Sequence, residues 1–324
     1  MLKGLPLIYN VLNSFCCTKI RNHPGLDTLF RSAMNGAKTV YVVDDDEDDR
    51  LLICEALQQV INQLTIIEVI DGRQLLELLA RRGRNPEPAI IILDINMPRM
   101  NGMETLAHIR SRPESEHLPV IMLSTSADQY YIKNSYSIGV NAYLKKPVSI
   151  NDYTYMAESI NVCFFNSYPL LKQGMAVAKT PRTKSILVIE DQADHWTLMQ
   201  FALRKSMPQA QVLRMKDSES TLNFLATGWH HMVQPPQLVL LDLYIPDRLQ
   251  GLDLLDKIRL FLTENGCSNV PIIIFSSSDH QEDIKACYQR QANAYMVKPI
   301  DLNESISYFK TLNQFIWDTY TVMN

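Results

Sequence analysis

The chain has 324 residues, of which 46% are apolar and 20% charged, a composition that fits a folded globular protein of about two domains and excludes a disordered one. The formal net charge of −4 argues against nucleic acid as a partner, because nucleic-acid binding usually needs a basic patch. The six cysteines form no CxxC pair, so they indicate reduced thiols and a cytoplasmic protein rather than a zinc or disulfide framework.

Residues 1–37 are the first segment along the chain. Their apolar stretch is interrupted by Asn10 and Asn13, is too short to cross a membrane and is followed by no small-residue cleavage site. We interpret the segment as a helical or disordered extension and expect no membrane partner. Two alternatives stay open, a start codon placed too far upstream and a helix that lies on a membrane surface.

From residue 38 to residue 165, short apolar runs alternate with segments of helical period. The predicted strands are 39–43, 64–69, 89–93, 119–123 and 141–145, and the predicted helices are 48–63, 72–82, 102–112, 127–139 and 150–165. Runs such as IIIL (90–93) are apolar on both faces, which is typical of strands that helices cover on both sides. The pattern therefore predicts an α/β domain with a doubly wound parallel sheet.

The second half of the chain repeats the first. The blocks VYVVDD (40–45), IIILDINMP (90–98), LPVIMLSTS (118–126) and NAYLKKP (141–147) recur in order as ILVIED (186–191), LVLLDLYIP (238–246), VPIIIFSSS (270–278) and NAYMVKP (293–299). Four matched blocks in one order indicate an internal duplication. We therefore predict domains at 38–165 and 184–320, a linker at 166–183 that contains proline and glycine, and a tail at 321–324.

Polar residues follow the strands of each half at their carboxyl ends. The first set comprises Asp44, Asp45, Asp94, Ser124 and Lys146, and the second comprises Glu190, Asp191, Asp242, Ser276 and Lys298. Because the carboxyl ends of parallel strands meet at one edge of a sheet, each set should converge on one pocket. Three adjacent carboxylates with room for water suit Mg²⁺, and a lysine and a serine opposite them suit a phosphoryl group that is transferred to a carboxylate.

These motifs resemble the receiver domains of response regulators in bacterial two-component systems, over 38–165 and 184–320. DINMP (94–98) and DLYIP (242–246) resemble the family's phosphorylation loop, and the Lys-Pro pairs at 146–147 and 298–299 resemble its lysine and cis-proline. The resemblance implies that each half has a flavodoxin-like (βα)5 fold. It also implies that Asp94 and Asp242 are the phosphoacceptors.

The resemblance assigns a role to each remaining site residue. Mg²⁺ would be held by Asp44, Asp45, Asp94 and the carbonyl of Asn96, and in the second half by Glu190, Asp191, Asp242 and the carbonyl of Tyr244. Ser124 and Ser276 would hydrogen-bond the phosphoryl group, and Lys146 and Lys298 would pair with it. Tyr143 and Tyr295 match the family's switch aromatic, with plain core packing as the alternative. Tyr244 is bulkier than Asn96, which predicts slower hydrolysis of a phosphorylated Asp242.

The acid run DDDEDD (44–49) is expected to divide into two parts. Asp44 and Asp45 would face the metal, whereas residues 46–49 would open a helix, solvated and favoured by its dipole. His195 lies near the second site in the sequence. It is expected either to contact a partner or to be an ordinary surface histidine.

The function that the resemblance implies is signal transduction by a two-component response regulator. The phosphoryl donor would be a histidine kinase or a histidine phosphotransfer protein, and the output would be phosphorylation-dependent contact with an unidentified protein or a phosphorelay, since no output motif is recognised. Such a protein catalyses its own phosphorylation and is no conventional enzyme. The alternatives are a scaffold with inactive pockets and a phosphatase of the haloacid-dehalogenase type, which is disfavoured because Asn96 and Tyr244 replace its second aspartate.

A group of tyrosines marks the fourth and fifth helices of the first half: Tyr130, Tyr131, Tyr136, Tyr153 and Tyr155. Exposed tyrosines would suit a protein interface, either between the two domains or in a homodimer. Internal packing of about half of them is the alternative.

Overall fold

The computed structural model describes residues 38–82, 89–126, 128–165, 184–299 and 301–320. The predicted extension at 1–37, the linker at 166–183 and the tail at 321–324 lie outside the described residues. The two repeats fall within one compact unit, Lys38–Asn324. None of the described helices has the length and hydropathy that crossing a bilayer requires.

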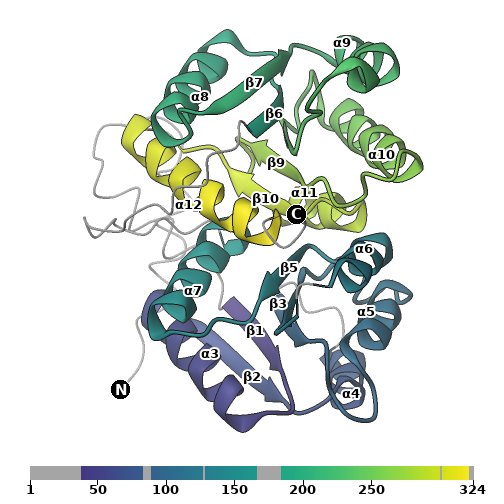
Figure 1. The fold of residues 1–324 in the computed structure, drawn as a ribbon, viewed down its shortest axis with the longest axis vertical. Helices are drawn as coiled ribbons and strands as arrows, with labels where there is room; N and C mark the ends of the chain where they lie inside the picture. The colour runs from purple at the N-terminus through teal and green to yellow at the C-terminus, as the bar shows by residue number, and fades with distance from the viewer. Residues whose placement is uncertain (1–37, 83–88, 127, 166–183, 300, 321–324) are drawn as a thin grey trace, which may run out of the picture. The chain divides into compact units, whose positions relative to one another are not determined.

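The first repeat alternates strands and helices in the predicted order (Figure 1). Its elements are β1 (Lys38–Val43), α3 (Glu47–Val60), β2 (Leu64–Val69), α4 (Gly72–Arg82), β3 (Ala89–Asp94), α5 (Gly102–Arg110), β4 (Val120–Ser124), α6 (Gln129–Ile138), β5 (Ala142–Lys145) and α7 (Ile150–Phe165). All strand pairs are parallel, and the sheet order is β2-β1-β3-β4-β5. This order confirms the predicted doubly wound, flavodoxin-like fold.

The second repeat has the same architecture, with one irregular segment between α9 and β8. Its elements are β6 (Lys184–Ile189), α8 (Ala193–Ser206), β7 (Ala210–Met215), α9 (Ser218–Asn223), η1 (Phe224–Gly228), η2 (Trp229–His231), β8 (Leu238–Leu241), α10 (Arg248–Glu264), β9 (Ile272–Ser276), α11 (Gln281–Gln289), β10 (Ala294–Val297) and α12 (Leu302–Tyr320). The sheet order β10-β9-β8-β6-β7 reproduces the first sheet. The duplication seen in the sequence is therefore a duplication of the fold.

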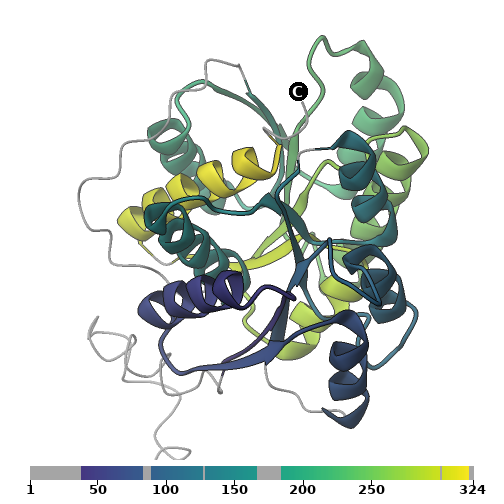
Figure 2. The ribbon, with the colours of Figure 1, turned by 60° about the horizontal axis from the view of Figure 1, so that its bottom comes forward.

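Each sheet is covered by helices on both faces, which explains its apolar strands (Figure 2). In β1, Val40 and Val42 pack in the cluster that includes α3, whereas Tyr41 and Val43 pack in the cluster that includes α4. Alternate residues of a strand point to opposite faces, so a strand buried on both faces must be apolar throughout.

Two glycines allow helices to pack close behind the loops that follow β3 and β8. A Cβ atom on Gly102 would lie 2.3 Å from the carbonyl oxygen of Asp94, and one on Gly251 would lie 1.8 Å from that of Leu243. Both helices, α5 and α10, therefore approach the polar strand ends more closely than a side chain would permit.

One expectation about the backbone was wrong. The resemblance implied cis peptide bonds before Pro147 and Pro299, but in the described part of the chain the cis bond lies between Ile245 and Pro246. The two isomers of a bond before proline differ by only about 0.5–1 kcal/mol, so the packing of each turn decides between them.

Two asparagines at matching positions connect the repeats within the compact unit. Asn141 Nδ2 donates a hydrogen bond to the carbonyl of Ala292 (2.9 Å), and Asn293 Nδ2 donates one to the carbonyl of Asn141 (3.0 Å). Both asparagines are buried. Each also accepts hydrogen bonds within its own repeat, from Arg110 at Asn141 and from Arg259 at Asn293.

Candidate functional site

The first polar pocket forms where β1, β3 and β5 end. Asp44 follows β1, Asp94 is the last residue of β3, and Lys146 follows β5. The Lys146 ammonium lies 2.7 Å from Asp44 Oδ2 and 2.8 Å from Asp94 Oδ1. The two aspartates are only 2% and 4% exposed. The sequence prediction that these residues converge is therefore reproduced in the geometry.

The electrostatics of this pocket follow from burying several charges together. Burial raises the pKa of Asp44, and the neighbouring Asp94 adds to that effect, while Lys146 opposes it. For Lys146, burial works to lower the pKa, but hydrogen bonds with the aspartates outweigh burial and raise the pKa above its usual value. The ammonium thus partly neutralises a set of carboxylates that would otherwise repel one another.

The predicted division of the acid run is wrong at Asp49. Asp46 caps α3 by accepting from the backbone N–H groups of Asp48 and Asp49, as expected for a helix start. Asp49 was predicted to be solvated, yet its side chain lies 2.8 Å from the Lys146 ammonium. The first turn of α3 turns this residue toward the end of β5, which the sequence pattern did not reveal.

A possible metal-ligand set is present in the first pocket. Asp44, Asp45 and Asp94 each offer a carboxylate oxygen, and these oxygen atoms lie within 4.8 Å of one another. Asp45 is exposed, so this side of the pocket faces solvent. The role predicted for the Asn96 carbonyl stays a prediction, although the backbone N–H of Asn96 donates to Asp94 Oδ2 at 2.7 Å.

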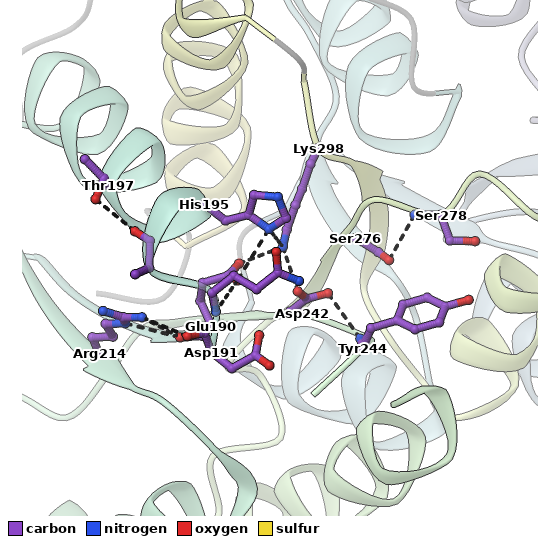
Figure 3. A network of polar contacts seen from close by, with 12 residues as sticks. Glu190, Asp191, His195, Thr197, Arg214, Asp242, Tyr244, Ser276, Ser278 and Lys298 are labelled. Atoms are coloured by element: carbon purple, nitrogen blue, oxygen red, sulfur yellow. Dashed lines mark hydrogen bonds and ion pairs between the residues drawn. The ribbon is translucent and has the colours of Figure 1, made fainter. Parts of the chain in front are cut away.

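The second pocket repeats this arrangement with one additional type of group (Figure 3). The Lys298 ammonium lies 2.6 Å from Glu190 Oε2, 2.7 Å from Asp242 Oδ2 and 3.2 Å from His195 Nδ1. Burial raises the pKa of Glu190, with Lys298 opposing and Asp242 adding to the effect. Sequence reasoning placed His195 near this pocket but gave it no role in it.

The acidic pair of the second pocket is divided between two environments. Glu190, His195 and Asp242 form the set whose ligand atoms lie within 4.8 Å of one another. Asp191, which the resemblance also assigned to the metal, is exposed and is not a member of that set. Arg214 fixes the backbone here, because its guanidinium donates to the carbonyl of Glu190 at 3.1–3.2 Å.

Both serines end their strands inside the pocket region. Ser124 and Ser276 are buried, and each hydroxyl oxygen accepts from the backbone N–H two residues later, at 3.1 Å from Ser126 and 3.2 Å from Ser278. The loop after β4 or β9 is therefore coupled to the serine. The hydrogen bond predicted between each serine and a phosphoryl group stays a prediction.

The candidate switch tyrosines point inward in both repeats. Tyr143 and Tyr295 are fully buried. The Tyr143 hydroxyl donates to the carbonyl of Ser126 at 3.3 Å, and that of Tyr295 to the carbonyl of Ser278 at 2.9 Å. Each tyrosine thus touches the loop that follows the pocket serine, in addition to packing in the core. The switch role of each tyrosine stays a prediction.

A network around Asp283 was missed by the sequence analysis. Asp283 on α11 is buried and accepts hydrogen bonds from the Tyr244 hydroxyl (2.9 Å) and the Ser278 hydroxyl (2.6 Å), and Arg248 forms an ion pair with it. Burial works to raise the pKa of Asp283, but these partners outweigh burial and lower it. The offset of 152 residues between the repeats places Tyr131 at the position that matches Asp283. This replacement of a tyrosine by an aspartate was the sequence signal that could have indicated the network.

The tyrosine-rich segments divide between exposed and buried positions. Tyr130 and Tyr131 on α6 are 68% and 40% exposed, whereas Tyr136 and Tyr153 are buried. Tyr155 is half-buried, and its hydroxyl lies 3.5 Å from the carbonyl of Thr311 on α12. Internal packing therefore accounts for part of the group. The homodimer stays a prediction.

Comparison with known proteins matches one family in both repeats. The family model described as the response regulator receiver domain matches residues 40–158 and 186–310. Both matched regions lie inside the predicted domains 38–165 and 184–320.

Three relatives each match this chain over about the length of one repeat. The response regulator Rcp1 of Synechocystis is 32% identical over 129 residues, which is 39% of this chain and 88% of that protein. A probable chemotaxis protein CheY of Rhizobium etli is 30% identical over 112 residues, 34% of this chain and 82% of that protein. Among solved structures, response regulator RPA3017 in red light signalling of R. palustris is 38% identical, with a TM-score of 0.35, over 39% of this chain and 92% of that one.

Proposed function

Because the chain belongs to the response-regulator receiver family and carries two receiver domains of two-component signalling, we propose that it accepts phosphoryl groups on Asp94 and Asp242. One observation carries this proposal in both repeats. A lysine ammonium lies 2.8 Å from Asp94 Oδ1 in the first pocket and 2.7 Å from Asp242 Oδ2 in the second. A fixed cation at that place stabilises the charge that a phosphoryl group brings to a carboxylate.

The donor would be the phosphohistidine of a histidine kinase or of a phosphotransfer protein. A carboxylate oxygen of Asp94 or Asp242 attacks the phosphorus, the phosphorus–nitrogen bond breaks, and the leaving imidazole takes up a proton. Ser124 and Ser276, at the ends of the neighbouring strands, would donate a hydrogen bond to a phosphoryl oxygen. The chain's own groups would thus orient the acceptor and stabilise the transferred group.

Mg²⁺ is the cofactor that the first donor set fits. All three side-chain ligands there, from Asp44, Asp45 and Asp94, are carboxylates, which are the ligands that Mg²⁺ prefers in proteins. Burial raises the pKa of Asp44, and the neighbouring Asp94 adds to that effect, so a divalent cation beside them would favour the ionised carboxylates. When bound, Mg²⁺ supplies positive charge at the phosphoryl oxygens. The carbonyls of Asn96 and Tyr244 would complete the two sites.

The output would be a change in protein contacts. Each switch tyrosine touches the carbonyl two residues beyond the pocket serine, so a shift of that loop toward a phosphoryl group would reach Tyr143 or Tyr295. The downstream partner is then a protein that distinguishes the phosphorylated surface, or a phosphotransfer protein that takes the group onward. A cytoplasmic location belongs to the same proposal.

Incubation with acetyl phosphate and Mg²⁺, followed by intact mass measurement, tests the proposal. Wild type should gain two phosphoryl groups, Asp94→Asn and Asp242→Asn should each gain one, and the double variant none. Chelation of the metal before mixing should suppress all additions, because the carboxylates then lack the charge that balances the incoming phosphoryl group.

The matched control is Asp253→Asn, which removes an aspartate that pairs with Lys257 on the surface of α10. It should leave two additions. No addition to the wild-type chain under any condition would contradict the proposal and would leave a scaffold that works without phosphorylation.

A further inference from the structure

An arginine side chain contacts the acidic loop, the three residues between the first strand and the first helix of each repeat. In the first repeat, Arg50 Nη1 donates a hydrogen bond to the carbonyl oxygen of Asp44 at 2.8 Å. In the second, Arg214 donates to the carbonyl oxygen of Glu190 from Nε at 3.2 Å and from Nη2 at 3.1 Å (Figure 3). Asp44 and Glu190 occupy matching positions, so both guanidinium groups bind the same point of the receiver backbone.

The two arginines come from different elements. Arg50 lies on α3, whereas Arg214 lies on β7. By the offset of 146 residues that relates the two acidic loops, Trp196 takes the position of Arg50 on the helix. By the same offset, Arg214 takes the position of Glu68 on the strand. The repeats therefore make one contact from two different positions, which indicates that the contact, and not a particular residue, is the feature that both receiver domains share.

Each arginine is held by the residue at the other exchanged position. Arg50 Nε lies 3.4 Å from Glu68 Oε2, an ion pair that joins the helix residue to the strand. The Arg214 guanidinium lies 5.1 Å from the centre of the Trp196 ring, a cation–π contact that joins the strand residue to the helix. An ion pair in one repeat and an aromatic ring in the other thus orient the same group.

The guanidinium completes the hydrogen bonding of the first acidic residue in each loop. The backbone N–H of Asp44 donates to the carbonyl of Val69 at 3.1 Å, and that of Glu190 donates to the carbonyl of Met215 at 3.1 Å. With an arginine at its carbonyl, the acidic residue is fixed at both backbone groups, and a charged donor makes the stronger kind of hydrogen bond. The direction of its carboxylate toward the pocket lysine, at 2.7 Å in the first repeat and 2.6 Å in the second, is fixed as a result.

We propose that Arg50 and Arg214 are positioning residues for phosphoryl transfer, and that the two exchanged pairs are equivalent ways to supply the guanidinium. Each arginine acts through the acidic loop and not on the transferred group. It supports a residue of the proposed Mg²⁺ set, so its loss should weaken Mg²⁺ binding and spare the reaction at saturating Mg²⁺. The inference rests on the proposed function, because the acidic residues matter for phosphoryl transfer only if that function holds.

Phosphoryl addition from acetyl phosphate, measured by intact mass at a series of Mg²⁺ concentrations, tests this inference. Arg50→Met in the Asp242→Asn background should raise the Mg²⁺ concentration for half-maximal rate at Asp94 by at least ~10-fold, because loss of an outer-shell partner of a metal ligand typically costs that much. The rate at saturating Mg²⁺ should approach that of the parent. In the Asp94→Asn background, Arg50→Met should leave the second site unchanged, which provides an internal control.

Arg214→Met is the reciprocal variant and should affect Asp242 while sparing Asp94. A second readout needs no phosphoryl transfer: in the absence of acetyl phosphate, Mg²⁺ should raise the thermal unfolding midpoint less in each variant than in its parent, since a bound ligand stabilises the folded state. Arg204→Met is the matched control, because Arg204 is an exposed arginine in the last turn of α8. It should leave the Mg²⁺ requirement of both sites unchanged.

An exchange variant separates the contact from the residue that makes it. Arg50→Trp should be impaired as Arg50→Met is. Addition of Glu68→Arg gives the first repeat the arrangement of the second and should lower the Mg²⁺ requirement again toward that of the parent. An exchange variant that is folded by circular dichroism and yet as impaired as Arg50→Trp would overturn the equivalence of the two pairs.

Two results would overturn the positioning role. One is an unchanged Mg²⁺ requirement in both Arg50→Met and Arg214→Met. The other is an equal loss of rate at every Mg²⁺ concentration, which a purely structural role would produce. No phosphoryl addition to the wild-type chain would overturn the proposed function instead.

Discussion

Position 244 carries a tyrosine where the first repeat carries Asn96, two residues after each proposed acceptor aspartate. The backbone N–H of Tyr244 donates to Asp242 Oδ1 at 3.1 Å, and its hydroxyl donates to Asp283 at 2.9 Å. Tyr244 is therefore held at its backbone N–H, next to Asp242 (Figure 3), and at its hydroxyl. A fixed ring at the pocket should hinder the water that hydrolyses a phosphoaspartate, whereas an asparagine leaves more space.

Replacement of Tyr244 by asparagine should therefore shorten the lifetime of phosphorylated Asp242. In the Asp94→Asn background only the second site can be phosphorylated. There we expect Asp242 to lose its phosphoryl group several-fold faster, because lowering the hydrolysis barrier by ~1 kcal/mol raises the rate about fivefold. The decay of the phosphorylated mass after removal of acetyl phosphate measures this rate. Asn96→Tyr in the Asp242→Asn background is the reciprocal variant and should slow the loss. A wild-type second site that decays faster than the first would refute the idea.

Strands and their carboxyl ends were the elements most accessible to prediction. Runs such as IIIL are apolar on both faces and end at a polar residue, so the placement of Asp94, Ser124 and Lys146 followed from the parallel arrangement alone. Two contacts could not be predicted from the strand arrangement: that of Asp49 with Lys146 and that of Asp283 with Tyr244. Each depends on how a helix is rotated relative to residues from a distant part of the chain. The hydrophobic periodicity of a sequence indicates which face of a helix is apolar. It does not indicate which charged residue from a distant part of the chain contacts the polar face.

Helix α10 should tolerate no side chain at its contact with the acceptor loop. In Gly251→Ala the added Cβ would meet the Leu243 carbonyl at 1.8 Å, so the backbone next to Asp242 must shift. We expect a loss of ~1–3 kcal/mol in the free energy of unfolding, as for other overpacked sites, and reduced phosphorylation of Asp242. Chemical denaturation and intact mass after acetyl phosphate measure the two effects.

Gly102→Ala is the reciprocal variant for α5, since its Cβ would meet the Asp94 carbonyl at 2.3 Å. It should reduce phosphorylation of Asp94 and spare Asp242, so each variant contains an intact site as its internal control. Full phosphorylation of both aspartates in both variants would show that the loops adjust without cost.

At the scale of the whole molecule, the duplication has produced paired contacts between the repeats as well as paired sites. Asn141 and Asn293 each accept hydrogen bonds within their own repeat through Oδ1 and donate across to the other repeat through Nδ2. The two functions belong to different atoms of one side chain. A substitution that keeps Oδ1 and removes the NH2 group should therefore keep the hydrogen bonds within a repeat and remove the hydrogen bond between the repeats.

Asn293→Asp makes that separation. Its Oδ1 can still accept from Arg259 and from the backbone N–H of Ile272, now with a charge that favours the guanidinium. The donor to the Asn141 carbonyl is lost, and a buried acceptor without its partner costs ~1–3 kcal/mol. We expect a lower free energy of unfolding and, because the cost falls on the contact between repeats, two resolved transitions in place of one on heating. Asn223→Asp, an exposed position in α9, should change stability by less than ~0.5 kcal/mol. A single transition at the wild-type midpoint in Asn293→Asp would mean that the asparagine contacts do not couple the two receiver domains.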